Sequence, residues 1–566
     1  MDKIWHIKET PSTEEVNLLA KTININPNLA SLLIQRGVTD YKEAEKFFRL
    51  SLSQLHDPFL MKDMEVAVKR LAKAIDGDEK ILIYGDYDVD GTTSVSMMVS
   101  FLQRYSNQLD FYIPDRYSEG YGVSEEGIHW AIAHEINLII SLDCGIKAFE
   151  TVAMAAAEGI DFIICDHHSP DTTLPSAIAV LDPKRVDCAY PYKELSGCGV
   201  GFKLLQGLVQ YKGWQEAELW PLLDLVAVSI AADIVPITHE NRVLCYFGIK
   251  KLEKDPRPGL SALIKVGNLN SPLTVTGVVF GIAPRINAAG RMEHAHSAVD
   301  LLLSKDEEEA LYLAGLVNTK NEMRKETELG IVAEALEMIE TTGSGKKTSV
   351  LFKEDWHKGV IGIVASKCIE HFHRPTIILT ESNGKATGSA RSVKGFDIHK
   401  AIGACGELLE QFGGHKYAAG LTMKIENIEA FQEKFEAVVS DTILDEQLVP
   451  AIIIDEEIEL SVISESFLAI IDQMEPFGPG NMKPIFVSRS LKATKLQLLK
   501  RLHLKMSVYN QEDGVVIDAI GFNMPEQYDL LQQDPYFDMA YTIERNNFRG
   551  NTSIQLHIKD IQLSLQ

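Results

Sequence analysis

The chain has 566 residues, of which 45% are hydrophobic and 24% are charged, and its formal net charge is −25. This length predicts several domains, and the composition excludes a disordered or low-complexity protein. No apolar run approaches the roughly 20 residues of a membrane span, and the start "MDKIWHIKETPSTEE" has no apolar signal segment, so we expect a cytoplasmic protein without a membrane partner.

The cysteines predict a reducing compartment. The seven cysteines are odd in number, scattered and without a C-x-x-C pair, which argues against a disulfide framework and against a structural zinc site. Cys144 and Cys165 stand beside acidic residues. Because neighbouring side chains in a strand face opposite ways, we expect both thiols to pack in the core.

Five short apolar runs, separated by helix-like segments, occupy the region from residue 80 to 185. They predict parallel strands joined by crossover helices, and therefore an α/β fold. Each run ends in an aspartate or an aspartate-containing cluster. The runs are 81–86, 110–115, 138–143, 161–168 and 177–182. Ligands of open α/β sheets bind at the carboxyl ends of the strands, so these acids should converge on one crevice.

Three groups of polar residues at these strand ends could hold a divalent metal ion. A single aspartate after a strand is commonly a helix cap or turn residue. Carboxylates at every second position, as at residues 86, 88 and 90, repel one another unless a cation lies among them. Carboxylate and imidazole together favour Mn²⁺ over Mg²⁺. The groups are Asp86, Asp88 and Asp90; Asp143; and Asp166, His167 and His168.

Further along the chain, the pattern changes twice. A helical region includes the apolar stretch 218–237, which puts Asp233 near a helix end, and the charge-rich run 305–340 predicts one long connecting helix. A second α/β module follows, with strands at 349–355, 375–380 and 385–392, a helix at 359–370, and a helix ending before 413–421. Short strand signals from 449 onward predict a small β domain or barrel.

The segment 476–511 is basic in an otherwise acidic chain. It contains seven lysines and arginines and no aspartate or glutamate. The net charge alone argues against a nucleic-acid partner, because phosphate binding requires a basic surface. This segment is therefore either the solvated face of a small β domain or an electrostatic track for a polyanion.

Several motifs resemble those of a known superfamily. "GDYDVDGTTS", "SLDCGI", "DHHSP" and "AADIVPI" occur in the order typical of DHH phosphoesterases, and "GGHKYAAG" resembles the signature of the accessory DHHA1 domain. "PDRYSEGYG", "LSGCGVGFK", "APRINAAGRM" and "PFGPGN" resemble the RecJ family within that superfamily. The resemblance extends from about residue 15 to the end of the sequence.

The resemblance implies an α/β fold in which a parallel-sheet DHH domain is joined by a long helix to a smaller α/β DHHA1 domain, followed by an OB-type β-barrel. We expect an N-terminal segment at 1–45, the DHH domain at 46–304, the connecting helix at 305–344, the DHHA1 domain at 345–446 and the OB domain at 447–566.

The resemblance also implies an activity. We expect a metal-dependent exonuclease that degrades single-stranded DNA from 5′ to 3′, releases 5′-mononucleotides by two-metal hydrolysis, and acts in DNA repair and recombination. The implied cofactor is Mn²⁺ or Mg²⁺, with two ions. The implied partners are single-stranded DNA, a RecQ-type helicase and a single-strand-binding protein, and the implied state is a monomer.

Carried over to this sequence, the metal ligands are Asp88, Asp90, Asp143, His167 and Asp233, with Asp143 bridging two ions. Asp86 is either a ligand or an acceptor in the surrounding shell. Family members begin the first motif with histidine where this chain has Tyr84, so one metal is expected to bind more weakly. The implied catalytic residues are His168, which would donate to a phosphate oxygen, with Asp143 and Asp166.

The implied substrate contacts lie in four places. Arg116, Ser389 and Arg391 match positions that capture the terminal 5′-phosphate, and Arg285 is a further arginine that can grip phosphate. Gly413, Gly414, His415 and Lys416 either approach the DNA strand or form a helix C-cap. Lys495, Lys500 and Arg501 belong to the expected distal track.

Two other functions remain open on sequence grounds. One is a phosphodiesterase acting on short oligonucleotides or cyclic dinucleotides, although the 120 residues expected for the OB domain exceed what so small a substrate needs. The other is an inactive DHH protein that serves as a replication scaffold, although a scaffold has no reason to keep clustered carboxylates.

Overall fold

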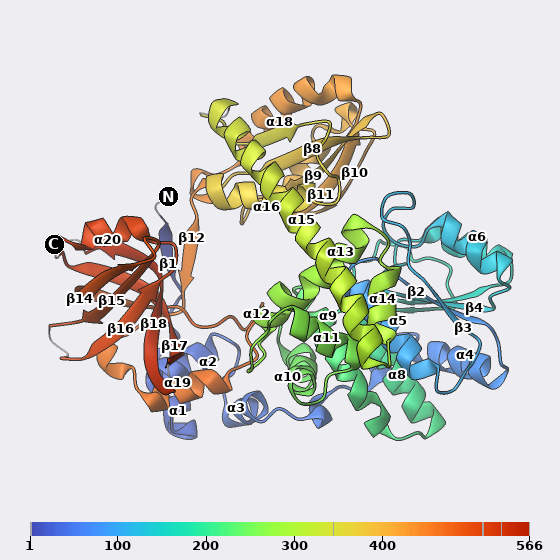
Figure 1. Cartoon of the computed structure of the whole chain (residues 1–566). Coiled ribbons are helices and arrows are strands. Elements are labelled where there is room, and N and C mark those ends of the chain that lie inside the picture. The colour runs from blue at the N-terminus through green and yellow to red at the C-terminus, as the bar shows by residue number, and fades with distance from the viewer. Residues whose placement is uncertain (1–2, 343–344, 512–513, 534, 549, 565–566) are drawn as a thin grey trace. The chain divides into compact units, whose positions relative to one another are not determined.

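The computed structural model describes residues 3–342, 345–511, 514–533, 535–548 and 550–564 (Figure 1). Contacts divide the chain into two compact units. The sheet–barrel unit comprises Trp5–Ala283, Leu302–Glu307 and the part from Ile452 onward. The long-helix unit is built mainly from Pro284–Leu301 and Glu308–Ala451.

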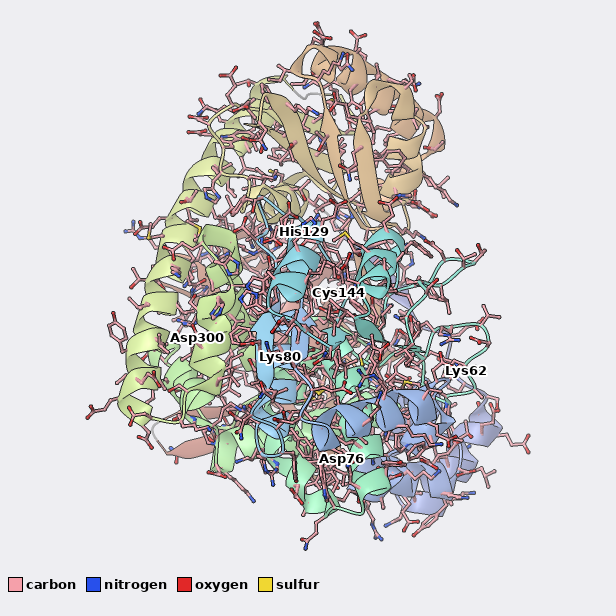
Figure 2. The ribbon with its side chains drawn as sticks, turned by 90° about the vertical axis from the view of Figure 1, so that its right-hand side faces the viewer. Lys62, Asp76, Lys80, His129, Cys144 and Asp300 are labelled. Carbon is pink, nitrogen blue, oxygen red and sulfur yellow. The ribbon has the colours of Figure 1, made fainter. Side chains whose placement is uncertain are left out.

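A five-stranded parallel sheet forms one core of the sheet–barrel unit. Its order is β3-β2-β4-β5-β6, and every neighbouring pair runs parallel. The strands are β2 (Ile81–Gly85), β3 (Leu109–Tyr112), β4 (Leu138–Leu142), β5 (Asp161–Cys165) and β6 (Ala179–Leu181). Figure 2 labels Lys80, directly before β2, and Cys144, two residues after the end of β4. All five expected strands are present, and their carboxyl ends share one edge.

Helices cover both faces of this sheet, which explains why its strands are apolar on both sides. On one face, α6 (Glu125–Ala133) and α7 (Phe149–Ala157) share a hydrophobic cluster with β2, β4 and β5. The other face packs against α4 (Met64–Asp76), α5 (Val89–Leu102) and α8 (Gly197–Lys212).

The cysteines are all buried and none forms a disulfide. Cys144 belongs to the cluster beneath α6 and α7, and Cys165 is completely buried at the end of β5. Burial raises the pKa of both thiols, so they stay protonated at neutral pH and are poor metal ligands. The expectation that both pack in the core is confirmed.

Two helices follow the sheet and frame a predicted metal ligand. α9 (Leu223–Ala232) ends at Asp233, whose backbone N–H donates to Ser229. α10 (His239–Lys254) begins after a short link. Within the stretch 218–237 the helix ends at Asp233 as expected, but α9 begins only at Leu223, because Glu216–Leu222 forms a 3-10 helix that contains Pro221.

The long-helix unit contains the predicted connector. α15 (Glu307–Thr342) is a single helix of 36 residues, about 54 Å long at 1.5 Å per residue, and is yellow-green in Figure 1. The end expected for this connector, residue 344, lies outside the described residues.

A second sheet follows α15 in the chain, with the order β10-β11-β9-β8-β7. β7 and β8 are parallel, and the other pairs are antiparallel. The strands are β7 (Ser349–Phe352), β8 (Thr376–Ser382), β9 (Lys385–Arg391), β10 (Gln411–His415) and β11 (Ala418–Met423). Gly413 and Gly414 lie within β10, so the helix C-cap alternative for this pair is wrong.

Five strands near the C-terminus, β14 to β18, form a closed barrel in the sheet–barrel unit. The pairing of β14 with β17 closes the sequence β14-β15-β16-β18-β17. The strands are β14 (Phe486–Leu499), β15 (His503–Tyr509), β16 (Val516–Gly521), β17 (Phe537–Phe548) and β18 (Asn551–Leu563). The expectation of an OB-type barrel is confirmed.

The N-terminal helices complete the barrel's core. Residues of α1 (Thr13–Ile23) and α2 (Pro27–Ile34) share one hydrophobic cluster with α19 (Glu465–Gln473) and with the barrel strands. Leu29 and Phe486, for example, are both almost completely buried in this cluster. Among the described residues, none of the helices has the length and apolar character needed to cross a membrane.

Candidate metal centre and substrate contacts

The carboxyl edge of the parallel sheet gathers one imidazole among several carboxylates. Nε2 of His167 lies 3.1 Å from Oδ1 of Asp143, 3.5 Å from Oδ2 of Asp233 and 3.8 Å from Oδ2 of Asp90. Both ring nitrogens of His167 are buried, and neither forms a hydrogen bond with a described residue. Two overlapping triads have ligand-like spacing, namely Asp90, His167 and Asp233, and Asp143, His167 and His168. A nitrogen surrounded by carboxylate oxygens is a donor set that fits a divalent cation.

The electrostatics of this cluster also favour a cation. Burial, reinforced by Asp90 and Asp88, raises the pKa of Asp143 and of Asp233 well above the ordinary carboxyl value. Burial also lowers the pKa of His167. So many buried acids are unfavourable when ionised, and a bound divalent ion would stabilise their ionised forms.

Asp86 and Asp88 differ in how they are held. Asp86 is completely buried, and its Oδ2 has no hydrogen-bond partner among the described residues. Burial and the nearby Asp88 carboxylate raise the pKa of Asp86. Asp88 is the N-cap of α5, because its Oδ1 accepts the N–H of Gly91 at 3.1 Å. A capping role and a ligand role are compatible, because a carboxylate has a second oxygen.

Tyr84 points away from this cluster. Its ring belongs to the hydrophobic cluster under α6 and α7. Its hydroxyl donates to the carbonyl of Gly122 at 3.1 Å and accepts the N–H of Ser124 at 3.0 Å. Position 84 therefore braces the loop before α6 and contributes no donor to the candidate metal centre.

Asp90 is anchored by the start of α8, a contact that the sequence analysis missed. Its Oδ2 accepts the N–H of Gly197 at 2.7 Å, and its Oδ1 accepts the N–H of Cys198 at 2.8 Å. Ser229 donates to the same Oδ1 at 2.6 Å. Three donors, two of them amides at the N-terminus of a helix, therefore hold both carboxylate oxygens of Asp90 in place.

Gly197 has a steric reason to be glycine. A Cβ atom at this position would lie 2.5 Å from Cβ of Asp143 and 2.9 Å from its Oδ1. The start of α8 therefore approaches two predicted ligands at once. The glycine-rich sequence "SGCGVG" before a helix was the available signal for such a close approach.

Asp166 holds His168 in place. One oxygen of Asp166 accepts the N–H of Ile146 at 2.9 Å, and the other lies 2.7 Å from Nδ1 of His168. Nε2 of His168 lies 3.2 Å from the hydroxyl of Tyr121, and the histidine side chain is 43% exposed. Although burial acts to lower it, the interaction with Asp166 raises the pKa of His168 to about 9. His168 is thus a charged donor at the surface of the cluster.

Arg116 lies near the first acid cluster. Its guanidinium carbon is 5.0 Å from the ring centroid of Tyr87, the residue between Asp86 and Asp88. Its charge also acts to lower the pKa of Asp86, against the larger effect of burial. Arg116 is therefore a cation at the edge of the candidate metal centre.

In the long-helix unit, Ser389 and Arg391 face the start of a helix. Nη1 of Arg391 donates to Oγ of Ser389 at 3.0 Å. A Cβ atom at Gly362 would lie 2.9 Å from both Nη2 of Arg391 and Oγ of Ser389. Gly362 belongs to the first turn of α16 (Ile361–Phe372), whose N-cap, Val360, provides no side-chain cap. An arginine, a hydroxyl and uncapped helix amides form an anion-binding arrangement. The sequence predicted this helix at 359–370, but it gave no sign that the helix start meets Ser389 and Arg391.

Arg285 is less accessible than expected. It is 8% exposed, and its Nε donates to Oδ1 of Asn318 on α15 at 2.8 Å. Burial lowers the pKa of its guanidinium. In this conformation Arg285 braces α15, and its role in substrate contact stays a prediction.

The predicted glycine-rich contact lies at the exposed edge strand of the second sheet. All residues of β10, including His415, are exposed, and so is Lys416. Gly414 has a φ of 141°, and a Cβ there would lie 2.3 Å from the carbonyl oxygen of Ala418. Gly413 faces open space. Gly414 therefore allows β10 to pack closely on β11, whereas Gly413 leaves the exposed edge without a side chain, which suits the approach of an extended chain.

Three of the basic residues stand at the tip of one barrel hairpin. Lys495, Lys500 and Arg501 are exposed; Lys495 lies at an irregularity in the outer part of β14, and Lys500 and Arg501 lie in the turn to β15. In the part of the chain that the structure describes, no carboxylate lies within ion-pair distance of these three. By contrast, Arg489 pairs with Glu457 and Asp538. The hairpin tip, and not the whole segment 476–511, is the accessible basic surface.

Comparisons with known proteins agree with these modules. The profile of the DHH family, N-terminal domain, matches residues 80–230. The DHHA1 domain matches residues 344–441, and the RecJ OB domain matches residues 454–560.

Relatives match over nearly the whole chain. The "Single-stranded-DNA-specific exonuclease RecJ" of Bacillus subtilis is 37% identical over 99% of this chain and 71% of the relative. The protein of the same description from Escherichia coli is 32% identical over 94% of this chain and 96% of the relative. The crystal structure of RecJ from Thermus thermophilus with Mn²⁺ matches with a TM-score of 0.86 at 25% identity, covering 100% of this chain and 80% of that chain. The chain therefore belongs to the RecJ family.

Proposed function

We propose that this chain is a metal-dependent exonuclease that degrades single-stranded DNA from 5′ to 3′ and releases 5′-mononucleotides. The observation that carries the proposal is the position of His167 Nε2 among oxygens of Asp143, Asp233 and Asp90. Relatives are named as single-stranded-DNA-specific exonucleases, and structures of one relative contain Mn²⁺ or Mg²⁺.

Two Mn²⁺ or Mg²⁺ ions are the proposed cofactor. Their ligands are Asp86, Asp88, Asp90, Asp143, His167 and Asp233. When bound, such ions supply a nucleophilic hydroxide and stabilise the leaving oxygen. The residues of the chain hold the ligands in place: α8 fixes Asp90 through the amides of Gly197 and Cys198.

His168 is the proposed donor to the scissile phosphate. Its Nδ1 is bound to Asp166, and its pKa, raised to about 9, keeps the ring charged at neutral pH. Its Nε2–H, which lies 3.2 Å from the hydroxyl of Tyr121, would donate instead to a non-bridging phosphate oxygen when the substrate binds, where a positioned donor stabilises developing charge. Asp166 orients the ring and favours its charged form.

The 5′ to 3′ direction is proposed to come from a terminal phosphate pocket. Ser389, Arg391 and the uncapped start of α16 supply donors that suit a phosphate dianion. Arg116 is proposed as a further phosphate contact. Capture of the terminal 5′-phosphate would restrict cleavage to the 5′ end of the strand.

Beyond the catalytic site, single-stranded DNA is proposed to contact basic surfaces and the exposed glycine-containing strand β10. Gly413, Gly414, His415 and Lys416 contact the strand, Arg285 contacts phosphate, and Lys495, Lys500 and Arg501 attract the distal backbone. We assign the N-terminal segment to 1–45, the DHH domain to 46–304, the connecting helix to 305–344, the DHHA1 domain to 345–446 and the OB domain to 447–566. The proposed setting is cytoplasmic DNA repair and recombination, as a monomer, with a RecQ-type helicase and a single-strand-binding protein.

Digestion of an end-labelled oligonucleotide tests this function. A single strand of roughly 40 nucleotides, longer than one OB-fold site, is labelled at either end and incubated with Mn²⁺ or with EDTA. We expect immediate release of a labelled mononucleotide from the 5′ end, with none in EDTA and none from blunt duplex. An intact strand would favour the scaffold, whereas cleavage of a dinucleotide alone would favour the small-substrate phosphodiesterase.

A further inference from the structure

The loop between α19 and β14 of the barrel contacts the chain just beyond Asp233. The N–H of Ile237 donates to the carbonyl of Pro479 at 2.6 Å, and Ile237 is completely buried. A Cβ atom at Gly478 would lie 2.5 Å from Cδ1 of Ile237. At Gly480 it would lie 2.9 Å from Cγ2 of Thr238. The glycines of "PFGPGN" therefore allow this loop to sit directly on residues 236–238.

The loop is itself rigidly held. Gly478 and Asn481 exchange backbone hydrogen bonds at 3.0 and 2.9 Å. The buried side chain of Asn481 donates to the carbonyls of Met474 and Pro476, each at 2.9 Å. Arg242, on α10, donates to the carbonyl of Met474 at 3.0 Å. A turn with this many bonds can act as a fixed support.

The supported segment is anchored from the other side as well. The carbonyl of Pro236 accepts hydrogen bonds from the hydroxyl of Tyr192 and from Nδ2 of Asn241, both at 3.0 Å. Residues 236–238 are thus held between the barrel loop and the helical part of the sheet–barrel unit. Asp233, at the end of α9, is only three residues away from Pro236.

The backbone is strained at Ile234, between Asp233 and the supported segment 236–238. Ile234 has a φ of 60°, although its side chain is 65% exposed and β-branched. Such a conformation is unfavourable for a β-branched residue and persists only where its surroundings impose it. α9 fixes the chain on one side of Ile234, and the barrel loop fixes it on the other.

We propose that the turn Gly478–Asn481 is a positioning element for the metal centre, which fixes the backbone that presents Asp233. The barrel module then helps to assemble the metal centre in addition to binding DNA. If the turn shifts, Ile234 can relax to an unstrained conformation, and the Asp233 carboxylate moves with it. This inference rests on the proposed role of Asp233 as a metal ligand.

The test measures Mn²⁺ binding by the full-length protein without DNA, by isothermal titration calorimetry and by the electron paramagnetic resonance signal of free Mn²⁺. We expect Gly478→Ala to weaken binding by about 10- to 100-fold, the range typical of residues that orient ligands. The Mn²⁺ concentration for half-maximal cleavage should rise by a similar factor, while the rate at saturating Mn²⁺ largely recovers.

Two further variants separate positioning from loss of folding. Asn481→Ala leaves Gly478 unchanged but removes two bonds that hold the turn, and it should also weaken Mn²⁺ binding. Gly478→Ala combined with Ile237→Ala removes the clash, since Cβ of Ile237 lies 3.6 Å from the added atom, and it should recover much of the affinity. Gly514→Ala, at a barrel glycine with a φ of 64° and open space, is the matched control that should bind Mn²⁺ normally.

Asp233→Asn distinguishes failure of this inference from failure of the proposed function. Weakened binding in Asp233→Asn, together with normal binding in folded Gly478→Ala and Asn481→Ala proteins, would overturn the positioning role alone. Normal Mn²⁺ binding in Asp233→Asn would overturn the ligand assignment on which the inference rests. Equal weakening in Gly514→Ala would show a general effect of barrel instability and would also contradict the inference.

Discussion

Nε2 of His167 and Oδ1 of Asp143 lie 3.1 Å apart, in side chains that are only 7% and 3% exposed. Their strands, β5 and β4, are neighbours in a parallel sheet, so the pair forms at the carboxyl edge as soon as the strands align. A buried imidazole beside a buried carboxylate, with Asp90 and Asp233 nearby, is a donor set that fits a divalent cation.

Asp143→Asn should abolish cleavage and yet stabilise the metal-free protein. The amide has nearly the shape of the carboxylate but removes one charge from a buried acidic cluster, whose repulsion opposes folding. Activity should fall to the level seen in EDTA, while affinity for single-stranded DNA stays close to that of the unmodified protein. Urea unfolding with EDTA should show a higher midpoint, and Asp110→Asn, at an exposed residue of β3, is the control. Full nuclease activity in Asp143→Asn would remove Asp143 from the metal centre.

The stabilising effect of Mn²⁺ should increase with pH. In the unfolded chain an aspartate titrates at about 3.9, whereas burial raises the pKa of Asp86, Asp143 and Asp233 in the folded protein. Above pH 4 the folded, metal-free protein therefore binds more protons than the unfolded chain, and its stability falls as pH rises through the raised pKa values.

Mn²⁺ competes with these protons. At a fixed Mn²⁺ concentration, the gain in melting temperature over the EDTA sample should be larger at pH 8 than at pH 6. Thermal melts at several pH values measure this difference. A gain that is independent of pH would contradict the involvement of the raised carboxyls.

Arg391→Ala should weaken the use of 5′-phosphorylated ends. A hydrogen bond to a charged group contributes about 1.5–3 kcal/mol, so kcat/KM on a 5′-phosphorylated strand should fall by roughly 10- to 100-fold. The effect on a 5′-hydroxyl strand should be smaller, and Mn²⁺ affinity should be unchanged. Lys385→Ala, on the same strand β9 and ion-paired with Glu410, is the matched control. An equal loss on both kinds of end would argue against a terminal phosphate pocket.

Charge reversal at the barrel hairpin tip should weaken binding of long strands. For single strands, log K changes with log salt by about 0.7 per phosphate contact, so replacing Lys495, Lys500 and Arg501 by Glu should reduce the slope by about 2. Filter binding of a long oligonucleotide at several salt concentrations measures the slope. The same number of reversals at Lys21, Lys42 and Lys46, exposed on the N-terminal helices, controls for net charge. Equal slopes in the two variants would make the tip a solvated surface only.

Ile234→Asn should stabilise the folded protein. The left-handed conformation costs about 1–2 kcal/mol for most residues and less for asparagine, and the isoleucine side chain is mostly exposed, so little burial is lost. Urea unfolding should show a gain of about 1 kcal/mol. Ile178→Asn, at another exposed isoleucine, lacks the unusual φ and should show no gain. A loss of stability in Ile234→Asn would mean that its side chain, and not its backbone, is the important feature.

The sequence predicted the gathering of acids at one edge of the sheet because this geometry follows from a simple periodicity. Apolar runs of four to six residues that end in acids specify parallel strands whose ends share an edge, so Asp86, Asp143 and His167 could be brought together without tertiary information. Helix endings also follow local rules, which is why Asp233 was expected at the end of α9.

Contacts that depend on docking could not be predicted in this way. The amide of Gly197 reaches Asp90 across 107 positions of the chain, and no local pattern specifies where α8 begins relative to α5. The close approach of Gly362 to Arg391 and the contact of Pro479 with Ile237 are of the same kind. In β10, glycine residues carry no strand signal, and only pairing of the backbone with β11 reveals the strand.

The shared core of the N-terminal helices and the barrel has a consequence for synthesis. Leu29 and Phe486 lie in the same cluster, and Trp5 donates to Asp560, 555 positions away, at 2.8 Å. At about 5–20 residues per second, a ribosome needs roughly 20–90 s to make the chain between Leu29 and Phe486. During that time the apolar faces of α1 and α2 have no barrel to cover them. The growing chain is thus exposed to misassembly for most of its translation. Its barrel core can form only after the last strands have been made and have packed against the N-terminal helices.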